Sequence, residues 1–225
     1  MFNLNKCLIL CATFNFNKME FNDKQIEILL VAEKLFAEEG FDGTSVRDIA
    51  KKASINIAMI SYYFGSKEKL LEAIVIHRIG SMKLKLENLV QEKITPIEKI
   101  DKLIEYYIHQ INANRHIHQI VHNEISNKKR NINIESFTEL KKNNFILVEN
   151  IVKQGQDLGQ FQPNINVALF SPLIIGSLLY FHMNKVLYED LLGLKTDEDF
   201  ENYIKNELTQ HIQKTIKALL LYEDK

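Results

Sequence analysis

Residues 23–64 constrain the fold more than any other part of the sequence, because their apolar spacing predicts three short helices joined by tight turns. In the first helix, the i, i+1, i+4, i+7, i+8 pattern of one buried face is made by Ile28, Leu29, Ala32, Leu35 and Phe36. Gly40 is expected to end that helix in the left-handed conformation, which costs glycine least. The segment therefore predicts a small three-helix unit.

Capping signals mark the second and third helices of this unit. Ser45 is followed three residues later by Asp48, which predicts a capping box at the start of a helix over 45–52. Asn56 is a good cap for a third helix over 57–64. The turn between these two helices is only a few residues long, so the helices must cross closely.

A helix, a tight turn and a second helix with a small residue at the crossing predict a helix-turn-helix. Ala50 is the small residue, and the miniature core is expected from Ile49, Ile55 and Ile60. The second helix of such a pair projects its outer residues into a major groove of DNA. On that outer face we expect Asn56, Ile57, Ala58, Met59, Ser61, Tyr62 and Tyr63. Tyrosine offers a ring for sugars and thymine methyl groups and a hydroxyl for a phosphate oxygen.

Charge must act locally if this unit binds DNA. The formal net charge of the chain is −1, and residues 20–70 carry seven basic and nine acidic side chains, so no global field attracts nucleic acid. The acidic residues cluster on the first helix and the turn after it, away from the expected groove face. Lys67 opens the next helix, where its charge adds to backbone amides suited to phosphate. Further candidates for phosphate contacts are Arg47, Lys51, Lys52 and Lys69.

The run ILLVAEKLFAEEGFDGTSVRDIAKKASINIAMISYYFGSKEKLLEAI resembles the N-terminal DNA-binding domain of the TetR/AcrR family of bacterial transcriptional regulators. The likeness covers about residues 24–74 and includes the YYF end of the recognition helix and the SKEKL that follows. It implies an all-helical homodimer with an N-terminal helix-turn-helix and a larger C-terminal ligand-binding domain. It also implies that the last two helices pair across the dimer as a four-helix bundle.

By position, the resemblance implies phosphate contacts from Thr44, Tyr63 and Lys67, and groove-facing side chains among those named above. The complete set predicted to contact DNA is Thr44, Ser45, Arg47, Asn56, Ile57, Ala58, Met59, Ser61, Tyr62, Tyr63 and Lys67. The sequence departs from the family pattern at Ser54, in a turn position usually taken by glycine. Ile57 and Met59 stand where polar residues are common, and Ser61 replaces a frequent aromatic residue. Few of these side chains can make a bidentate contact with a base, which leaves the operator sequence open.

Three segments are expected along the chain: an extension over residues 1–19 with an alternative start at Met19, the helix-turn-helix domain over 20–65, and a helical ligand-binding and dimerisation domain over 66–225. A weak sorting signal is the other interpretation of the extension. In the last domain we expect helices near 66–92, 96–112, 114–129, 134–158, 165–190 and 197–222. The fold class predicted is all-α.

An apolar ligand pocket with few polar groups is the preferred interpretation of the C-terminal domain. Its candidate lining residues are Tyr106, Tyr107, His109, Phe145, Tyr180, Phe181 and His182, although any of them can instead be ordinary core. His118 and His122 lie one helical turn apart and could bind a metal, but His109, His116 and the other polar residues nearby do not complete a ligand set. We therefore expect neither a metal nor a cofactor.

Residues 167–183 are apolar nearly all round, which suits either a membrane span or a helix buried against its own core and a partner chain. The run is short for a span and contains Pro172 and Gly176, so the buried or dimer interpretation is favoured. The sequence has two cysteines, Cys7 and Cys11, and none after them, so disulfides do not hold the fold. This is typical of a cytoplasmic protein.

Taken together, the sequence predicts a regulator that binds a double-stranded DNA operator as a homodimer and is released by a small ligand. The alternative is a DNA-bound structural or interaction protein whose C-terminal domain binds another protein. An enzyme is disfavoured, because the sequence has no glycine-rich phosphate loop, no G-x-S-x-G elbow and no H-E-x-x-H motif.

Overall fold

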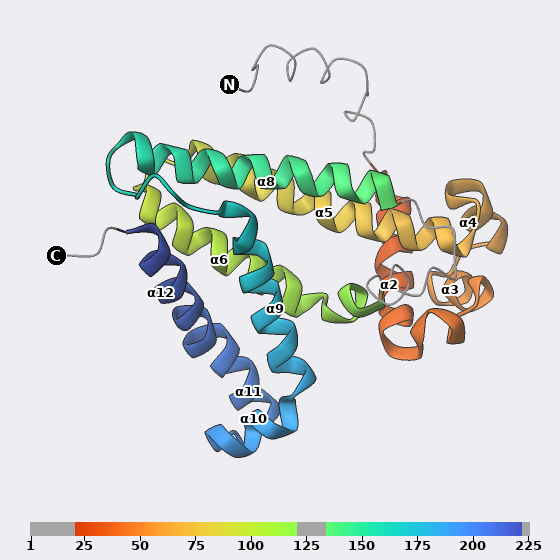
Figure 1. The fold of residues 1–225 in the computed structure, drawn as a ribbon. Coiled ribbons are helices and arrows are strands. Elements are labelled where there is room, and N and C mark those ends of the chain that lie inside the picture. Colours follow the sequence, from red (N-terminus) through yellow and green to blue (C-terminus); the bar gives the residue numbers. More distant parts are fainter. Residues whose placement is uncertain (1–20, 121–133, 222–225) are drawn as a thin grey trace, which may run out of the picture.

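The computed structural model describes residues 21–120 and 134–221, and within them every regular element is a helix (Figure 1). The expected extension over 1–19, His122 and most of the helix expected at 114–129 lie outside the described residues. The elements are α2 (Asp23–Gly43), α3 (Val46–Lys52), α4 (Ile57–Phe64), α5 (Lys67–Gln91), α6 (Pro96–Ala113), α8 (Ile134–Asp157), η2 (Val167–Leu169), α9 (Phe170–Met183), α10 (Lys185–Leu192), α11 (Asp197–Tyr203), η3 (Ile204–Leu208) and α12 (Thr209–Leu220).

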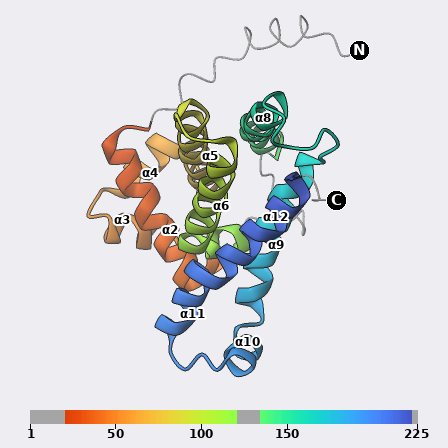
Figure 2. The ribbon, with the colours of Figure 1, turned by 90° about the vertical axis from the view of Figure 1, so that its left-hand side faces the viewer.

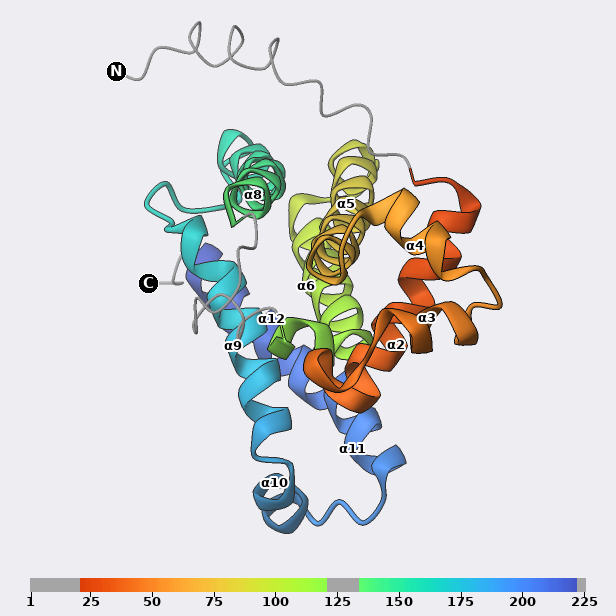
Figure 3. The ribbon, with the colours of Figure 1, turned by 90° about the vertical axis from the view of Figure 1, so that its right-hand side faces the viewer.

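Helices α2, α3 and α4 form a head at one end of the molecule (Figures 1 and 3). Its core buries the residues expected from the apolar spacing, including Phe36, Ile49 and Ile60. The first half of α5 completes that core with residues 70–75. The head core therefore extends past residue 65, where the sequence placed the domain boundary. Gly40 breaks the end of α2 with φ 75° and ψ 166°; the positive φ favours glycine, but the extended ψ differs from the left-handed conformation that the sequence predicted.

The remaining helices form the body, whose main core is separate from that of the head, while Ile117 and Phe137 from this part of the chain are buried in the head core. Helix α5 runs out of the head into the body, and α8 lies along it (Figure 1). Seen from the side, α5 and α6 lie between the head and α8 (Figure 2). Helices α9 and α12 pack against α6. Within α8, Gly155 is buried because the ring of Phe161 packs directly over it.

The single helix expected over 165–190 is wrong, because the chain turns sharply at Asn184. Helices α9 and α10 meet there, and the Asn184 side chain donates to the Tyr180 carbonyl at 2.9 Å, capping the end of α9. No single described helix is long and apolar enough to cross a membrane, and the segment Val167–Met183 reaches such a length only together with α10, from which it is bent by 84°.

The helix expected over 197–222 is continuous but contains one π-helical turn, η3. Phe200, Ile204, Leu208, Ile212 and Ile216 are spaced four residues apart, and in an α-helix this spacing drifts around the axis by about 40° per step. The wider π turn absorbs part of that drift, so four of these side chains are fully buried and Leu208 is partly buried against the same core. The hydroxyl of Thr209 satisfies the Ile204 carbonyl at 2.8 Å.

Candidate nucleic-acid interface

The crossing of α3 and α4 has the geometry expected of a helix-turn-helix. Ala50 and Ala53 are buried where the two helices meet. The amide of Ile55 donates to the Ala50 carbonyl at 3.0 Å, and the amide of Ser54 donates to the Lys51 carbonyl at 3.2 Å. Ser54 has φ 52°, which explains why glycine is usual at this turn position.

The N-terminus of α3 is closed by the predicted capping box. The amide of Ser45 donates to Asp48 Oδ2 at 3.0 Å, and the amide of Asp48 donates to Ser45 Oγ at 3.2 Å. Hydrogen bonds donated by the hydroxyl and then the amide of Ser45 lower the pKa of the Asp48 carboxyl. The cap places a carboxylate at the helix N-terminus and engages the amide and hydroxyl of Ser45, so Ser45 has fewer free donors for a phosphate than its position suggested.

Thr44 does not have the exposed side chain that a phosphate contact requires. It is 1% exposed, and its hydroxyl oxygen lies 2.9 Å from the Gly40 carbonyl oxygen and 3.2 Å from that of Leu35, to which it can donate. The hydroxyl thereby satisfies carbonyls left free where α2 breaks at Gly40. The Thr44 hydroxyl therefore closes the turn between α2 and α3, and the phosphate contact expected of Thr44 stays a prediction.

Lys67 connects the start of α5 to the same turn. Its ammonium donates to the carbonyls of Phe41 at 2.8 Å and Thr44 at 2.9 Å, and it lies 4.4 Å from the centre of the Phe41 ring. An ammonium carries three N–H groups, so one remains for a phosphate oxygen. Lys67 thus has a structural role in addition to the DNA contact predicted from its position.

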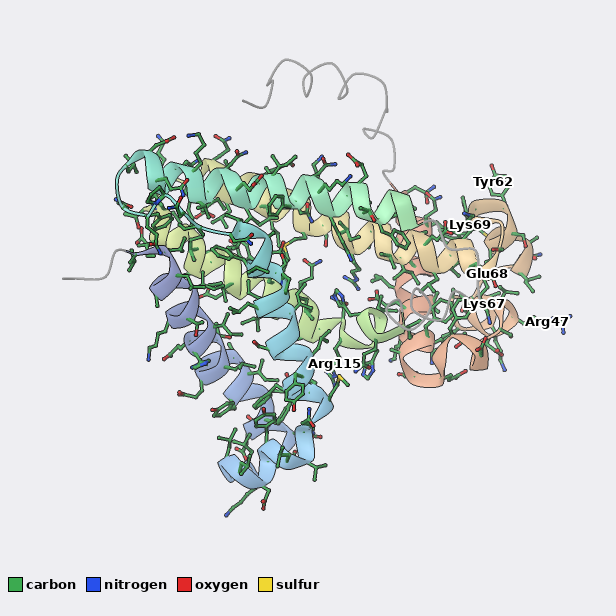
Figure 4. The ribbon with its side chains drawn as sticks, in the orientation of Figure 1. Arg47, Tyr62, Lys67, Glu68, Lys69 and Arg115 are labelled. Carbon is green, nitrogen blue, oxygen red and sulfur yellow. The ribbon has the colours of Figure 1, made fainter. Side chains whose placement is uncertain are left out.

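The outer face of α4 is exposed at the end of the molecule, as the sequence predicted. Ile57, Ala58 and Ser61 face solvent, and Tyr62 is 83% exposed (Figure 4). Met59 is half-buried. This surface is mostly apolar or aromatic, so it suits thymine methyl groups and sugars better than bidentate base contacts.

Two further members of the predicted set are partly engaged. The side-chain oxygen of Asn56 accepts a hydrogen bond from the Ala58 amide at 2.8 Å. The side-chain nitrogen of Asn56 is then the group that can donate to DNA. Tyr63 is half-buried against the head core, with its ring 5.1 Å from that of Tyr62. Both side chains are therefore held in fixed positions beside the exposed face of α4.

Positive charge beside this face comes chiefly from α3. Arg47 projects from the outer edge of the head (Figure 4), and Lys51 and Lys52 are also exposed. Within the described parts of the chain, Arg47 and Lys52 form no ion pair. Lys69, in contrast, is paired with Glu72 at 2.8 Å. The side chains best placed to meet phosphate are thus on α3.

Within the described residues, the side chains predicted to line a ligand pocket do not all border the same groove. Tyr106 and Tyr107 pack on the body core, and burial raises the pKa of the Tyr107 phenol, whose hydroxyl bonds Ser171. Phe145 is half-buried on α8, whereas His109 is exposed and lines a groove of about 570 Å³ between α6 and η3. Neighbouring residues of a helix point about 100° apart, so Tyr106 and Tyr107 have different surroundings.

The three consecutive candidates on α9 differ in their exposure to solvent. Tyr180 is exposed, while Phe181 is buried in a stack with the rings of Tyr188, Phe200 and Tyr203. Tyr180 and Phe181 both border a groove of about 530 Å³ between α9–α10 and η3–α12. The grooves found in the body are therefore open at its surface.

His182 belongs to a polar chain that joins three helices. Its Nε2 lies 2.5 Å from Asn112 Oδ1 on α6, and Asn112 Nδ2 donates to Glu201 on α11 at 2.5 Å. Burial, with Arg115 nearby, lowers the pKa of His182 to about 4. The imidazole is thus neutral and donates from Nε2. No group of three residues able to hold a metal ion is present in residues 21–120 and 134–221.

Two family models match the chain. The model for bacterial regulatory proteins of the tetR family matches residues 28–74, over the head and the start of α5. The model for the C-terminal region of YsiA-like proteins matches residues 76–201, which is more than half of the chain. The chain belongs to the TetR family. It is a DNA-binding transcriptional regulator, and the predicted all-α fold is confirmed.

The relatives of this TetR-family chain are transcriptional regulators, and the likeness covers most of their length. It is 29% identical over 194 residues to the transcriptional repressor NicS of Pseudomonas putida, covering 80% of this chain and 87% of NicS. It is 31% identical over 176 residues to the probable transcriptional regulator YttP of Bacillus subtilis, covering 76% and 84%. These relatives favour a regulator over the alternative of a DNA-bound interaction protein.

Solved structures share the fold. FadR of Bacillus subtilis, in complex with stearoyl-CoA, superimposes with a TM-score of 0.66 at 20% identity, covering 86% of this chain and 98% of FadR. The ketosteroid regulator KstR2 of Mycobacterium tuberculosis gives 0.62 at 19% identity, covering 91% and 98%. At these identities the likeness shows the fold alone.

Proposed function

We propose that this TetR-family regulator is a cytoplasmic repressor that binds a palindromic operator as a homodimer and is released by a ligand held in its body. NicS and KstR2, both similar in sequence, are repressors by name, which supports this sign of regulation. The observation that carries the proposal is the exposed face of α4 beside the unpaired cations of α3.

Contacts with the operator divide between the two helices of the motif. Arg47, Lys51 and Lys52 on α3 are exposed beside the groove face and suit phosphates. On α4, Tyr62, Ile57 and the other exposed side chains face the groove and offer apolar surface to thymine methyl groups. An operator read in this way is expected to be rich in A·T pairs at the positions that α4 covers.

Dimerisation is assigned to the last helices because apolar side chains remain exposed there. Tyr180 and Met183 on α9 and Val186 on α10 are 59%, 73% and 81% exposed. The groove between α9–α10 and η3–α12 lies among them. A two-fold axis that pairs this surface with itself covers both features at once. The two α4 helices then have to lie about 34–36 Å apart, one turn of DNA.

A large, mainly apolar molecule is the ligand class we propose, and fatty acyl-CoA thioesters are the first to test. The C-terminal family model is that of YsiA-like proteins, a fatty acid metabolism regulator of Bacillus subtilis is 23% identical, and FadR has been solved with stearoyl-CoA. The body core between α5, α6, α8 and α9 is almost wholly aliphatic and aromatic, which suits an acyl chain.

The test begins with selection of genomic fragments retained by the purified protein, followed by footprinting. Release is then measured with stearoyl-CoA, free stearate and coenzyme A as separate additions. A palindrome released by stearoyl-CoA and not by coenzyme A supports the full proposal. A palindrome that none of them releases rejects the acyl-CoA class and leaves the repressor. The absence of any specific fragment rejects the repressor itself.

A further inference from the structure

The recognition helix α4 carries no charged side chain, so its contacts with bases cannot be ionic. Its eight residues, Ile57–Phe64, are apolar or bear a hydroxyl. Ile60 is buried in the head core and fixes the rotation of the helix. Neighbouring residues of an α-helix point about 100° apart, so Ala58 and Tyr62 point away from Ile60, and both are exposed. Tyr62 projects from the outer end of the head (Figure 4). The crest of α4, formed by Ala58 and Tyr62, therefore offers DNA a methyl group and a phenol.

Few groups beside this crest can form hydrogen bonds with a base. Ile57, which is 39% exposed, and Ser61 lie on one side of the crest, and half-buried Met59 lies on the other. The hydroxyls of Ser61 and Tyr62 are the hydrogen-bonding side-chain groups of the exposed face. A hydroxyl carries one hydrogen and turns to suit either a donor or an acceptor. It therefore cannot make the two-point contacts by which arginine and asparagine identify guanine and adenine.

Asn56, at the N-terminus of α4, has a side chain of the kind that identifies adenine, but the helix cap already holds it. Its Oδ1 accepts from the Ala58 amide at 2.8 Å. A two-point contact with adenine uses this oxygen and the side-chain nitrogen together, with the amide edge turned into the groove. Loss of a cap weakens a helix, so turning Asn56 toward a base would cost α4 stability. Asn56 is left with one donor group, which suits a phosphate oxygen as well as a base.

An apolar face of this kind can distinguish bases by the C5-methyl group of a pyrimidine. In the major groove thymine presents this methyl group, and cytosine does not. Burial of one methyl group changes an affinity by about fourfold. The short side chain of Ala58 lets α4 lie close to the base edges, where the Ile57 side chain can cover a methyl group. 5-Methylcytosine places its methyl group at the same point of the groove as thymine.

We propose that α4 identifies its operator by the C5-methyl groups of pyrimidines, which pack against Ile57 and Ala58, and that 5-methylcytosine can replace thymine in this role. Methylation of a cytosine under α4 then tightens the binding of the repressor, so the operator takes a second signal besides the ligand. The cations of α3 position the head on phosphates and add no selectivity for methyl groups. This inference rests on the operator binding proposed above.

The test compares four base pairs at each position of the footprinted operator that α4 covers. Synthetic duplexes carry T·A, U·A, 5-methylcytosine·G or C·G there, with the pyrimidine on either strand, and fluorescence anisotropy measures the affinity at one salt concentration. T·A differs from U·A only in the methyl group, and 5-methylcytosine·G differs from C·G in the same way. At one or more positions the methyl group should raise the affinity about fourfold in both comparisons, and about sixteenfold when both half-sites carry it.

Variants locate the methyl contact on α4. Ile57→Thr keeps the branched Cβ and replaces apolar surface by a hydroxyl, and Ala58→Ser places a hydroxyl on the crest. At least one of them should reduce the methyl ratio from about fourfold to less than about twofold. Lys52→Met is the matched control, because Lys52 is exposed on the neighbouring helix α3. It should weaken the binding of all four duplexes equally and leave the methyl ratio unchanged. Circular dichroism melts check that each variant folds, and where one does not, the other decides.

Methyl ratios close to one at every position under α4, with the operator still bound, overturn the inference and keep the repressor. A ratio seen with thymine and absent with 5-methylcytosine also overturns it, because the methyl group is then not recognised by itself. A ratio that survives both Ile57→Thr and Ala58→Ser overturns the assignment to these two residues. If no specific fragment is retained in the first place, the proposed repressor fails, and this inference fails with it.

Discussion

Replacing Lys67 by methionine tests whether its ammonium holds the head together or serves only DNA. Methionine keeps most of the length of the side chain and removes the charge. The change deletes two hydrogen bonds to the carbonyls of Phe41 and Thr44 and the contact with the Phe41 ring. These two carbonyl groups, near the break in α2, are left with fewer hydrogen-bond donors.

The expected loss of stability follows from these contacts. A hydrogen bond from a charged donor contributes about 1.5–3 kcal/mol, and a cation over an aromatic ring about 0.5–1 kcal/mol at an exposed site. Lys67 is half-exposed, so we take the lower limits of these ranges, and the two hydrogen bonds with the ring contact give a total loss of about 3.5 kcal/mol. For a chain of this size the melting temperature should fall by about 7–14 °C.

Circular dichroism melts and DNA titrations at several salt concentrations provide the assay. Lys52→Met is the matched control, because Lys52 is exposed on α3 and has no ion pair within the described residues. This control should leave the melting temperature unchanged and reduce the salt slope of DNA binding by about 1, as loss of one phosphate contact does. Lys67→Met should lower the melting temperature in the absence of DNA. An unchanged melt together with a reduced salt slope would show that Lys67 acts on phosphate alone.

Three further predictions concern stability, and urea unfolding checks each. Ser54→Gly should raise the free energy of unfolding by about 0.5 kcal/mol, because relief of the strain at φ 52° exceeds the entropy that glycine loses on folding. A lower urea midpoint for the variant would contradict this. Gly155→Ala should cost about 1–3 kcal/mol, since the new Cβ would lie 2.2 Å from the Phe161 ring; a neutral result means that the ring moves freely. Burial lowers the pKa of both His118 and His182 to about 4. In the unfolded chain both histidines titrate near pH 6.5, so the unfolded state binds more protons than the folded state below that pH. The free energy of unfolding should therefore fall between pH 7 and pH 5 by about 1 kcal/mol for each histidine. His182→Gln should remove the part of this fall that His182 causes.

Local signals in the sequence predicted the head well. Caps, apolar spacing and the glycine at position 40 act within a few residues, so the bounds of α3 and α4 follow from short stretches of chain. Ser54 adopts the left-handed conformation that the usual glycine would adopt more easily. The exposed face of α4 was also predictable, because Ile60 is the buried residue that fixes which way the helix faces.

Contacts between distant residues were beyond local reasoning. The hydroxyl of Thr44 and the ammonium of Lys67 are engaged by carbonyls 4 to 26 residues away, and Glu33 is 45 residues from Arg78. Nothing in the spacing indicates these partners. The break at Asn184 has neither proline nor glycine to signal it, so the sequence predicted one helix where α9 and α10 form two.

The two attachments of α5 to the head limit where the molecule can bend. Lys67 ties the first residue of α5 to the turn after α2, and Arg78 ties its middle to α2 itself. These points lie about three helical turns apart, roughly 16 Å along the axis, with residues 70–75 packed into the head core between them. The first half of α5 must therefore move with the head. Ile117 and Phe137, from the part of the chain beyond α6, are buried in the same head core, so a signal from the body can reach the head through these side chains as well as through α5.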